Sequence, residues 1–228
     1  MSINILFAAL PSRWDTYETP LRRALDAVGL NYVLSPDIAP PDVDYIVYAP
    51  NSDVQDFVPF KGLKAVLNLW AGVEDVVGNP TLTVPLTRMV DHGLTQGMVE
   101  WVVGHTLRHH LGMDVHIHGQ DGDWRKDIPP LAQERKVTVL GLGVLGSAVG
   151  QALAGLGFDV TGWSRSAKMV EGVICLHGHT GLERALAQAE IVILLLPDTR
   201  ATRNILNADT LGSLPRGAVI INPGRGPL

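Results

Sequence analysis

The sequence has one cysteine, few aromatic residues and no excess of positive charge. Cys175 is the single cysteine among 228 residues, 6% are aromatic, and the formal net charge is -5. A lone thiol in an apolar run is typical of a protein from a reducing compartment, so we expect a cytoplasmic location. The negative charge argues against nucleic acid or an anionic membrane surface as the main partner.

Long apolar runs are also missing. The apolar stretch at residues 3–10 lacks the basic flank of a signal peptide and is too short to cross a bilayer. We expect it to form a first β-strand, and no membrane span is predicted. With 46% hydrophobic residues, the chain can bury the core of one large or two modest soluble domains.

What the sequence does contain is a repeated alternation of strand-like and helix-like segments. Strands are expected over residues 3–10, 31–34, 44–49, 65–69, 83–85, 137–140, 159–163, 172–176, 191–196 and 218–222. Helices are expected over residues 19–28 and 95–111, from the glycines after residue 140 to 156, and over 182–189. Such alternation predicts parallel sheets covered by helices. We therefore expect a flavodoxin-like domain over residues 1–92 and a Rossmann-like domain over residues 93–228, joined by the long helix at 95–111.

A glycine-rich segment follows the strand expected at residues 137–140. Residues 141–146 form a G-x-G-x-x-G pattern, and a helix-like run comes next. In this context Gly141 permits the turn, Gly143 lets a pyrophosphate approach the backbone, and Gly146 lets helix and strand pack closely. The amides at the positive end of the helix favour phosphate. The segment predicts a dinucleotide site, against the alternative of a glycine-rich turn that binds nothing.

The tip of the next strand bears on which dinucleotide is bound. NAD sites place a carboxylate about twenty residues beyond the glycines, where it accepts from the ribose hydroxyls. Here the strand ends in Ser164, Arg165 and Ser166, with Lys168 just beyond and no carboxylate among them. A guanidinium and hydroxyls can bind a 2′-phosphate, which a carboxylate would repel. The sequence favours NADP, with NAD and a solvated basic loop left as alternatives.

Four segments with characteristic spacing combine into one larger pattern. They are residues 139–146 around the glycines, 163–166 at the strand tip, 194–207 in the following strand and loop, and 215–226 near the end of the sequence. Together they resemble the D-isomer-specific 2-hydroxyacid dehydrogenases, and among these the glyoxylate/hydroxypyruvate reductase branch. The resemblance implies an NADP-dependent oxidoreductase acting on a small 2-keto acid.

The resemblance also implies roles for individual residues. The substrate carboxylate would bind backbone amides in the loop formed by Trp70, Ala71, Gly72 and Val73, and successive amides at a glycine turn form an anion-binding nest in any case. Trp124 matches a position that often packs against a second subunit, which implies a homodimer. The cofactor would contact Met98, Gly141, Gly143, Val144, Leu145, Gly146, Trp163, Ser164, Arg165, Ser166, Leu196, Pro197, Thr202, Pro223 and Gly224.

Arg225 is the catalytic residue that the resemblance implies. A planar, permanently charged fork can hold a 2-keto acid in one orientation and stabilise oxyanion character during hydride transfer. In relatives a histidine supported by a glutamate donates the proton, and both lie beyond the arginine. This sequence ends at Leu228, so we expect an incomplete second domain and a fragment or shortened gene product.

Other interpretations remain open. His105 and His109 lie one helical turn apart and could form half of a metal site, but a polar helix face is expected and no metal is predicted. Tyr48 lies over the substrate pocket in one interpretation and has a packing role in the other. A catalytically silent NAD(P)-binding scaffold is the main alternative to a reductase. A Rossmann enzyme for 6-phosphogluconate-like substrates is disfavoured, because such enzymes usually begin with the nucleotide loop.

Overall fold

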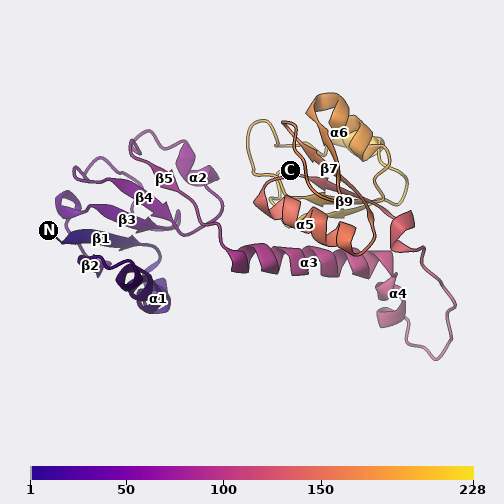
Figure 1. Ribbon diagram of the computed structural model, residues 1–228, viewed down its shortest axis with the longest axis horizontal. Helices are drawn as coiled ribbons and strands as arrows, with labels where there is room; N and C mark the ends of the chain where they lie inside the picture. Colours follow the sequence, from indigo (N-terminus) through magenta and orange to yellow (C-terminus); the bar gives the residue numbers. More distant parts are fainter. Residues whose placement is uncertain (1) are drawn as a thin grey trace. The chain divides into compact units, whose positions relative to one another are not determined.

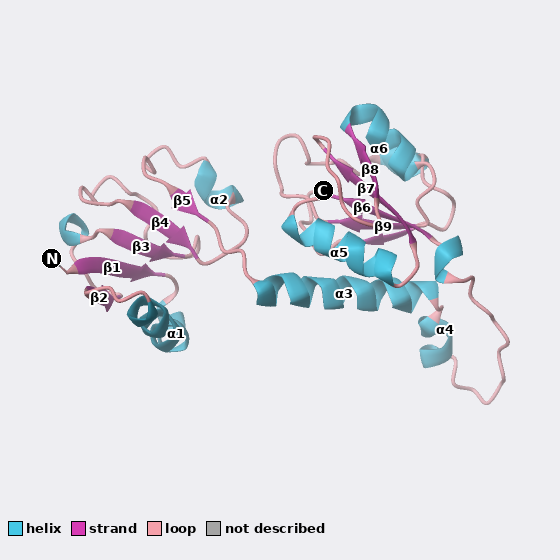
Figure 2. Cartoon of the chain, in the orientation of Figure 1, coloured by secondary structure: helices cyan, strands magenta, loops and turns pink. Residues whose placement is uncertain are grey.

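The computed structural model describes residues 2–228, and the chain divides into two compact units, Met1–Val90 and Asp91–Leu228 (Figure 1). Each unit has its own five-stranded sheet with helices against it (Figure 2). All strand pairs in both sheets are parallel, which confirms the predicted α/β fold class. None of the helices within residues 2–228 is long and apolar enough to cross a membrane.

In the sheet of the first unit, the second strand lies on one side of the first strand, and the later strands lie on its other side. Its strands are, in spatial order, β2 (Tyr32–Ser35), β1 (Ile3–Ala8), β3 (Tyr45–Tyr48), β4 (Ala65–Asn68) and β5 (Leu86–Thr87). The helical segments are the 3-10 turns Pro11–Arg13 and Pro40–Asp42 and the helices α1 (Trp14–Ala27) and α2 (Glu74–Val77).

Both faces of this sheet are apolar, as expected for parallel strands covered on two sides. Phe7 of β1 faces α1, and its ring lies 5.3 Å from the ring of Trp14. Leu6 points to the opposite face and belongs to a second buried cluster that includes Phe57. The alternation along β1 therefore builds one core on each side of the sheet.

The second unit also has a doubly covered sheet. Its strands are, in spatial order, β10 (Val219–Ile221), β9 (Ile191–Leu194), β6 (Lys136–Leu140), β7 (Asp159–Ser164) and β8 (Ile174–His177). Its helical segments are α3 (His92–His110), α4 (Met113–His118), α5 (Val144–Gly155), α6 (Gly178–Leu186), α7 (Ala208–Gly212) and the 3-10 turn Ala132–Glu134.

Helices α3 and α5 cover one face of the second sheet, and α6 covers the other (Figure 1). Val102 of α3 and Val149 of α5 are fully buried in one cluster with Val139 of β6. On the other side, the hydroxyl of Thr138 donates to the carbonyl of Ala185 over 3.1 Å. The side chains of β6 thus alternate between the two helical layers.

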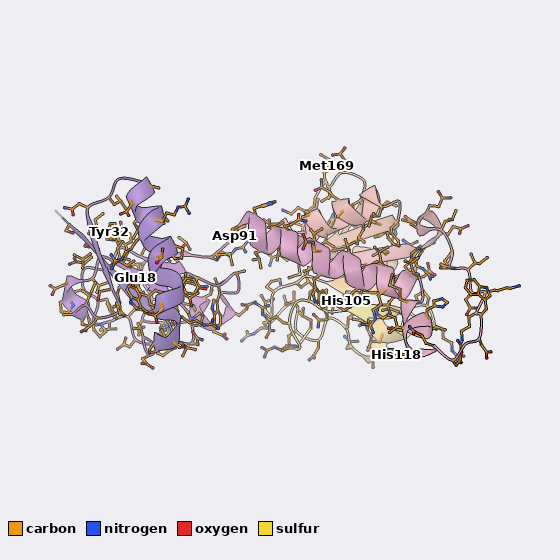
Figure 3. All side chains as sticks on the ribbon, turned by 90° about the horizontal axis from the view of Figure 1, so that it is seen from below. Glu18, Tyr32, Asp91, His105, His118 and Met169 are labelled. Atoms are coloured by element: carbon orange, nitrogen blue, oxygen red, sulfur yellow. The ribbon has the colours of Figure 1, made fainter. Side chains whose placement is uncertain are left out.

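The long helix begins earlier than residue 95, where the sequence pattern placed it. The carboxylate of Asp91 accepts a hydrogen bond of 2.7 Å from the backbone N–H of Leu94 and caps the start of α3 (Figure 3). Gly112, at φ 61°, follows the end of the helix. The capping aspartate, rather than the apolar pattern, sets the first residue.

Two other boundaries in the first unit differ from those expected. Helix α1 begins at Trp14 and includes Pro20, whereas the sequence predicted a helix over residues 19–28. Packing of Trp14 against Phe7 stabilises the additional turns. The strand expected at residues 83–85 lies at β5 instead. Pro85 has no N–H to donate to the neighbouring strand, and its carbonyl accepts from the N–H of Val66 at 2.9 Å.

Candidate functional site

The three glycines of the loop at residues 141–146 occupy three different environments. Gly141 has φ 107°, and a Cβ there would stand 2.5 Å from the carbonyl oxygen of Leu195. A Cβ on Gly146 would overlap the carbonyl oxygen of Gly141. Gly143 is exposed, and a Cβ there would meet no atom within 4 Å. Two glycines are therefore required by the fold, whereas the third leaves open space beside the backbone.

Helix α5 begins at this open position. Gly143 is its N-cap residue, and no side chain caps the helix. The first N–H groups of an α-helix, here those of Val144 and Leu145, have no acceptor within the helix and carry its positive dipole end. These features fit the pyrophosphate of a dinucleotide, which needs a close backbone approach and several N–H donors.

The tip of β7 combines buried and exposed polar groups. Trp163 is buried, and its indole N–H donates to the carbonyl of Gly178 over 2.8 Å. The buried Ser164 hydroxyl donates to the carbonyl of Ser166 over 2.8 Å and shapes the turn. Arg165 and Ser166 themselves are exposed. The exposed polar residues at this tip are therefore an arginine and a serine, with the exposed Lys168 just beyond them.

The loop after β9 is held by its own side chains. The guanidinium of Arg203 binds both carboxylate oxygens of Asp198, at 3.1 and 2.7 Å. That contact, with a smaller contribution from Arg225, holds the pKa of Asp198 below its ordinary value. The hydroxyl of Thr202 accepts from the N–H of Thr199 at 2.9 Å. Leu196 is half-buried and Pro197 is exposed in this loop.

The loop that carries Arg225 is fixed at both ends. Gly224 lies so close to β9 that a Cβ would stand 3.0 Å from the carbonyl oxygen of Leu194. The amide of Asn222 accepts from the N–H of Gly224 at 3.0 Å and donates to the carbonyl of Arg225 at 2.9 Å. Arg225 is exposed, and one of its guanidinium nitrogens donates to the carbonyl of Gly224 over 3.1 Å. Pro223 is half-buried between these residues.

The loop predicted to bind the substrate carboxylate follows β4 in the first unit. Trp70 is exposed, while Ala71, Gly72 and Val73 are half-buried. The carbonyls of Trp70 and Gly72 both accept from the side-chain amide of Asn68, each at 2.9 Å. Within residues 2–228, the N–H groups of Ala71, Gly72 and Val73 donate to no protein acceptor. The loop thus presents successive amides, as an anion-binding nest does.

Two residues with expected roles near the site lie mainly in the cores. Met98 is half-buried and packs against the cluster under α3 and α5. Tyr48 is 2% exposed, and its ring lies 5.5 Å from that of Phe57. Burial raises the pKa of Tyr48 above its ordinary value. The structure favours the packing interpretation of Tyr48.

Two histidines of α3 and α4 contact neighbouring side chains. Across the part of the chain that the structure describes, no three histidine, cysteine, aspartate or glutamate side chains gather to hold an ion. His105 instead packs against Trp101, with 4.1 Å between the ring centroids (Figure 3). His118, at the end of α4, lies 4.0 Å from the carboxylate of Asp114.

A hollow of about 410 Å³ lies elsewhere in the first unit. It opens at the carboxyl end of β1 and is lined by Phe7, Trp14, Ile38, Ser52 and Phe60, among others. None of the residues predicted to bind substrate lines it. The predicted substrate loop therefore lies outside this hollow.

The sequence interpretation missed the asparagines that shape both loops. Asn222 lies in the resembling segment at residues 215–226, and Asn68 lies just before the loop that begins at Trp70, yet neither was expected to have a role. Asn222 precedes a Pro-Gly pair, and asparagine before such a turn often bonds to the backbone two residues on. That signal could have identified Asn222. No comparable signal marks Asn68, because its partners depend on the fold of its loop.

Comparisons of the sequence with known proteins match large parts of the chain. The family model "D-isomer specific 2-hydroxyacid dehydrogenase, NAD binding domain" matches residues 102–228. Glyoxylate/hydroxypyruvate reductase A from Serratia proteamaculans is 36% identical over 172 residues, 72% of this chain and 55% of that protein. The protein of that name from Yersinia enterocolitica is 33% identical over 198 residues, 83% of this chain and 62% of that protein. The chain thus spans somewhat more than half the length of these relatives.

Solved structures are similar over the full described fold. The D-isomer specific 2-hydroxyacid dehydrogenase from Xanthobacter autotrophicus Py2, in complex with NADPH and MES, is 37% identical with a TM-score of 0.90. The NADPH-dependent glyoxylate/hydroxypyruvate reductase from Sinorhizobium meliloti, in complex with NADP and sulfate, is 32% identical with a TM-score of 0.79. Each comparison covers 100% of this chain and 74% of the solved chain.

Proposed function

This chain belongs to the D-isomer specific 2-hydroxyacid dehydrogenase family, and we propose that it binds NADPH and serves in the reduction of a small 2-keto acid such as glyoxylate or hydroxypyruvate. The glycine loop at residues 141–146 carries the proposal, since its open space lies at Gly143, where a pyrophosphate would approach. Relatives named glyoxylate/hydroxypyruvate reductase, and solved structures holding NADPH or NADP, support the choice of cofactor and substrate.

Each part of the cofactor would contact a different part of the second unit. The pyrophosphate would bind Gly143 and the amides of Val144 and Leu145, and the 2′-phosphate would bind Arg165 and Ser166. A guanidinium is suited to a phosphate because its planar fork donates two parallel hydrogen bonds. The other expected cofactor contacts are Met98, Gly141, Gly146, Trp163, Ser164, Leu196, Pro197, Thr202, Pro223 and Gly224.

The negatively charged substrate is assigned to two kinds of hydrogen-bond donor, the backbone N–H groups of one loop and a guanidinium. The amides of Ala71, Gly72 and Val73 would receive the carboxylate of the 2-keto acid. Arg225 would bind and orient the acid and stabilise negative charge on its carbonyl oxygen. NADPH held by these residues would supply a hydride for the carbonyl carbon, and a proton taken up from solvent at the carbonyl oxygen would complete the 2-hydroxy acid.

Ligand titration tests this function. We expect the chain to bind NADPH at least about tenfold more tightly than NADH, and then to bind oxamate, an unreactive analogue of a 2-keto acid. Arg225→Lys should weaken oxamate binding and leave NADPH affinity unchanged, because a lysine cannot reproduce the bidentate fork. Arg216→Lys, on the exposed turn before β10, is the matched control and should change neither.

Two outcomes would count against the proposal. Equal affinity for NADPH and NADH would remove the NADP assignment. Tight NADPH binding with no oxamate binding would favour the silent nucleotide-binding scaffold instead of a reductase.

We also propose that the protein forms homodimers in the cytoplasm. Support for association comes from the segment after α4, where Trp124 is 86% and Ile128 is 92% exposed. Several large apolar side chains exposed in one segment are typical of a surface that a partner covers, whereas a single one is not. Support for the location comes from Cys175, a free, half-buried thiol suited to a reducing compartment.

A further inference from the structure

Asn68 lies at the end of β4, directly before the loop assigned to the substrate carboxylate. Its side chain is almost inaccessible, with 4% of the residue exposed. The side-chain nitrogen donates to the carbonyls of Trp70 and Gly72, at 2.9 Å each. The Trp70 carbonyl also accepts from the N–H of Met89 at 3.1 Å. One buried amide thus sets the direction of two peptide groups in the loop.

The direction of those carbonyls fixes the direction of the N–H groups. In a trans peptide the C=O and the N–H of one peptide group point to opposite sides. The carbonyl of Trp70 shares its peptide group with the N–H of Ala71, and the carbonyl of Gly72 shares its group with the N–H of Val73. Because both carbonyls turn toward Asn68, both N–H groups turn away from it, and neither donates to an acceptor within the described chain.

An asparagine at position 68 leaves its side-chain oxygen unpaired among the described residues, which is unfavourable, and this supports a role for its side-chain nitrogen as a donor. The side-chain oxygen of Asn68 is buried and has no hydrogen-bond partner among residues 2–228. A buried, unpaired oxygen is unfavourable, and an apolar side chain of similar volume would avoid that cost. A carboxylate of the same shape would lack the two donors.

We propose that Asn68 is the positioning residue of the carboxylate nest, holding the Ala71 and Val73 amides outward to receive the 2-keto acid. The inference rests on the proposed function for the identity of the ligand. Asn68 itself touches no ligand; it acts through the peptide groups that it orients.

The first test needs no ligand. In Asn68→Leu, the amide resonances of Ala71, Gly72 and Val73 should shift, because their peptide groups lose the side chain that orients them. The Met89 N–H should exchange faster, because the Trp70 carbonyl that accepts from it is no longer held in place by Asn68. Asn68→Asp should give the same changes, since its carboxylate cannot donate to either carbonyl. If the resonances of Ala71 and Val73 stay as in the wild type, the inference is overturned.

The second test measures oxamate binding in the presence of NADPH. Asn68→Leu should weaken oxamate binding about tenfold or more while NADPH affinity and the thermal midpoint stay near those of the wild type. Asn79→Leu is the matched control, because Asn79 donates to the carbonyl of Gln55 at 2.8 Å in a different loop of the same unit. It should lower the thermal midpoint and leave oxamate binding unchanged.

The two measurements separate the inference from the function on which it rests. Shifted resonances with undiminished oxamate binding would overturn the positioning role. A wild-type chain that binds NADPH but no oxamate would defeat the proposed function, while the resonances would still decide whether Asn68 orients the loop.

Discussion

The carbonyl oxygen of Gly141 occupies the space that a Cβ atom on Gly146 would need. This contact joins the turn after β6 to the first turn of α5, so the close approach of strand and helix depends on a residue without a side chain. Gly143, between them, has φ -79° and open space around its Cβ position. The fold therefore requires a glycine at 146, and only a bound ligand would require one at 143.

Substituting each glycine by alanine should separate these two requirements. Gly146→Ala must displace backbone atoms and should destabilise the second unit by about 1–3 kcal/mol, as overpacking does. Gly143→Ala should leave stability within about 0.5 kcal/mol of the wild type but weaken NADPH binding about tenfold or more. Chemical denaturation and NADPH titration measure the two effects. Unchanged NADPH binding in Gly143→Ala would contradict the assignment of the pyrophosphate to this loop.

The sequence predicted the parts of this molecule that depend on local pattern. Alternating apolar segments gave both parallel sheets, and the glycine spacing gave the turn from β6 to α5. It failed where a tertiary contact decides, as at α1, which begins at Trp14 because that ring packs on Phe7 of β1. The hydrogen bonds of Asn68 were missed for the same reason, since a buried amide reveals its partners only once the loop is folded.

Arg165 should determine the choice between the two nicotinamide cofactors. In Arg165→Asp the new carboxylate would repel a 2′-phosphate and accept from ribose hydroxyls, so the preference for NADPH should disappear. We expect NADPH binding to fall roughly tenfold to a hundredfold, the range for a lost hydrogen bond to a charged group. Fluorescence titration with both cofactors measures the change. Arg184→Asp on α6 makes the same charge change at another exposed position and should preserve the preference.

Protonation of His110 should destabilise the second unit. His110 is 6% exposed, its ring lies 4.9 Å from that of Phe158, and its Nδ1 has no partner among the described residues. Burial, with a smaller contribution from Arg135 and against an opposing one from Glu190, lowers its pKa below the ordinary 6.5. The folded state then binds fewer protons than the unfolded state, so the stabilisation is fully present above pH 6.5 and is lost as the pH falls below it.

Denaturation midpoints measured between pH 5 and 8 check this expectation. His110→Gln should flatten the decline in stability below pH 6.5, the ordinary pKa of the imidazole. His179→Gln is the control, because the His179 side chain is 88% exposed on α6, and it should retain the wild-type decline. An equal slope in His110→Gln and the wild type would assign the pH dependence to other groups.

The exposed apolar side chains after α4 should determine self-association. Replacing Trp124 and Ile128 together by serine removes the two large side chains at 86% and 92% exposure, and should raise the dimer dissociation constant at least about tenfold. Met169→Ser is the matched control, because Met169 is 99% exposed on the loop after β7 (Figure 3). It should leave the dimer intact, since an isolated apolar side chain on a surface needs no partner. Sedimentation equilibrium over a range of concentrations distinguishes the variants, and a wild-type chain that stays monomeric throughout would refute the dimer.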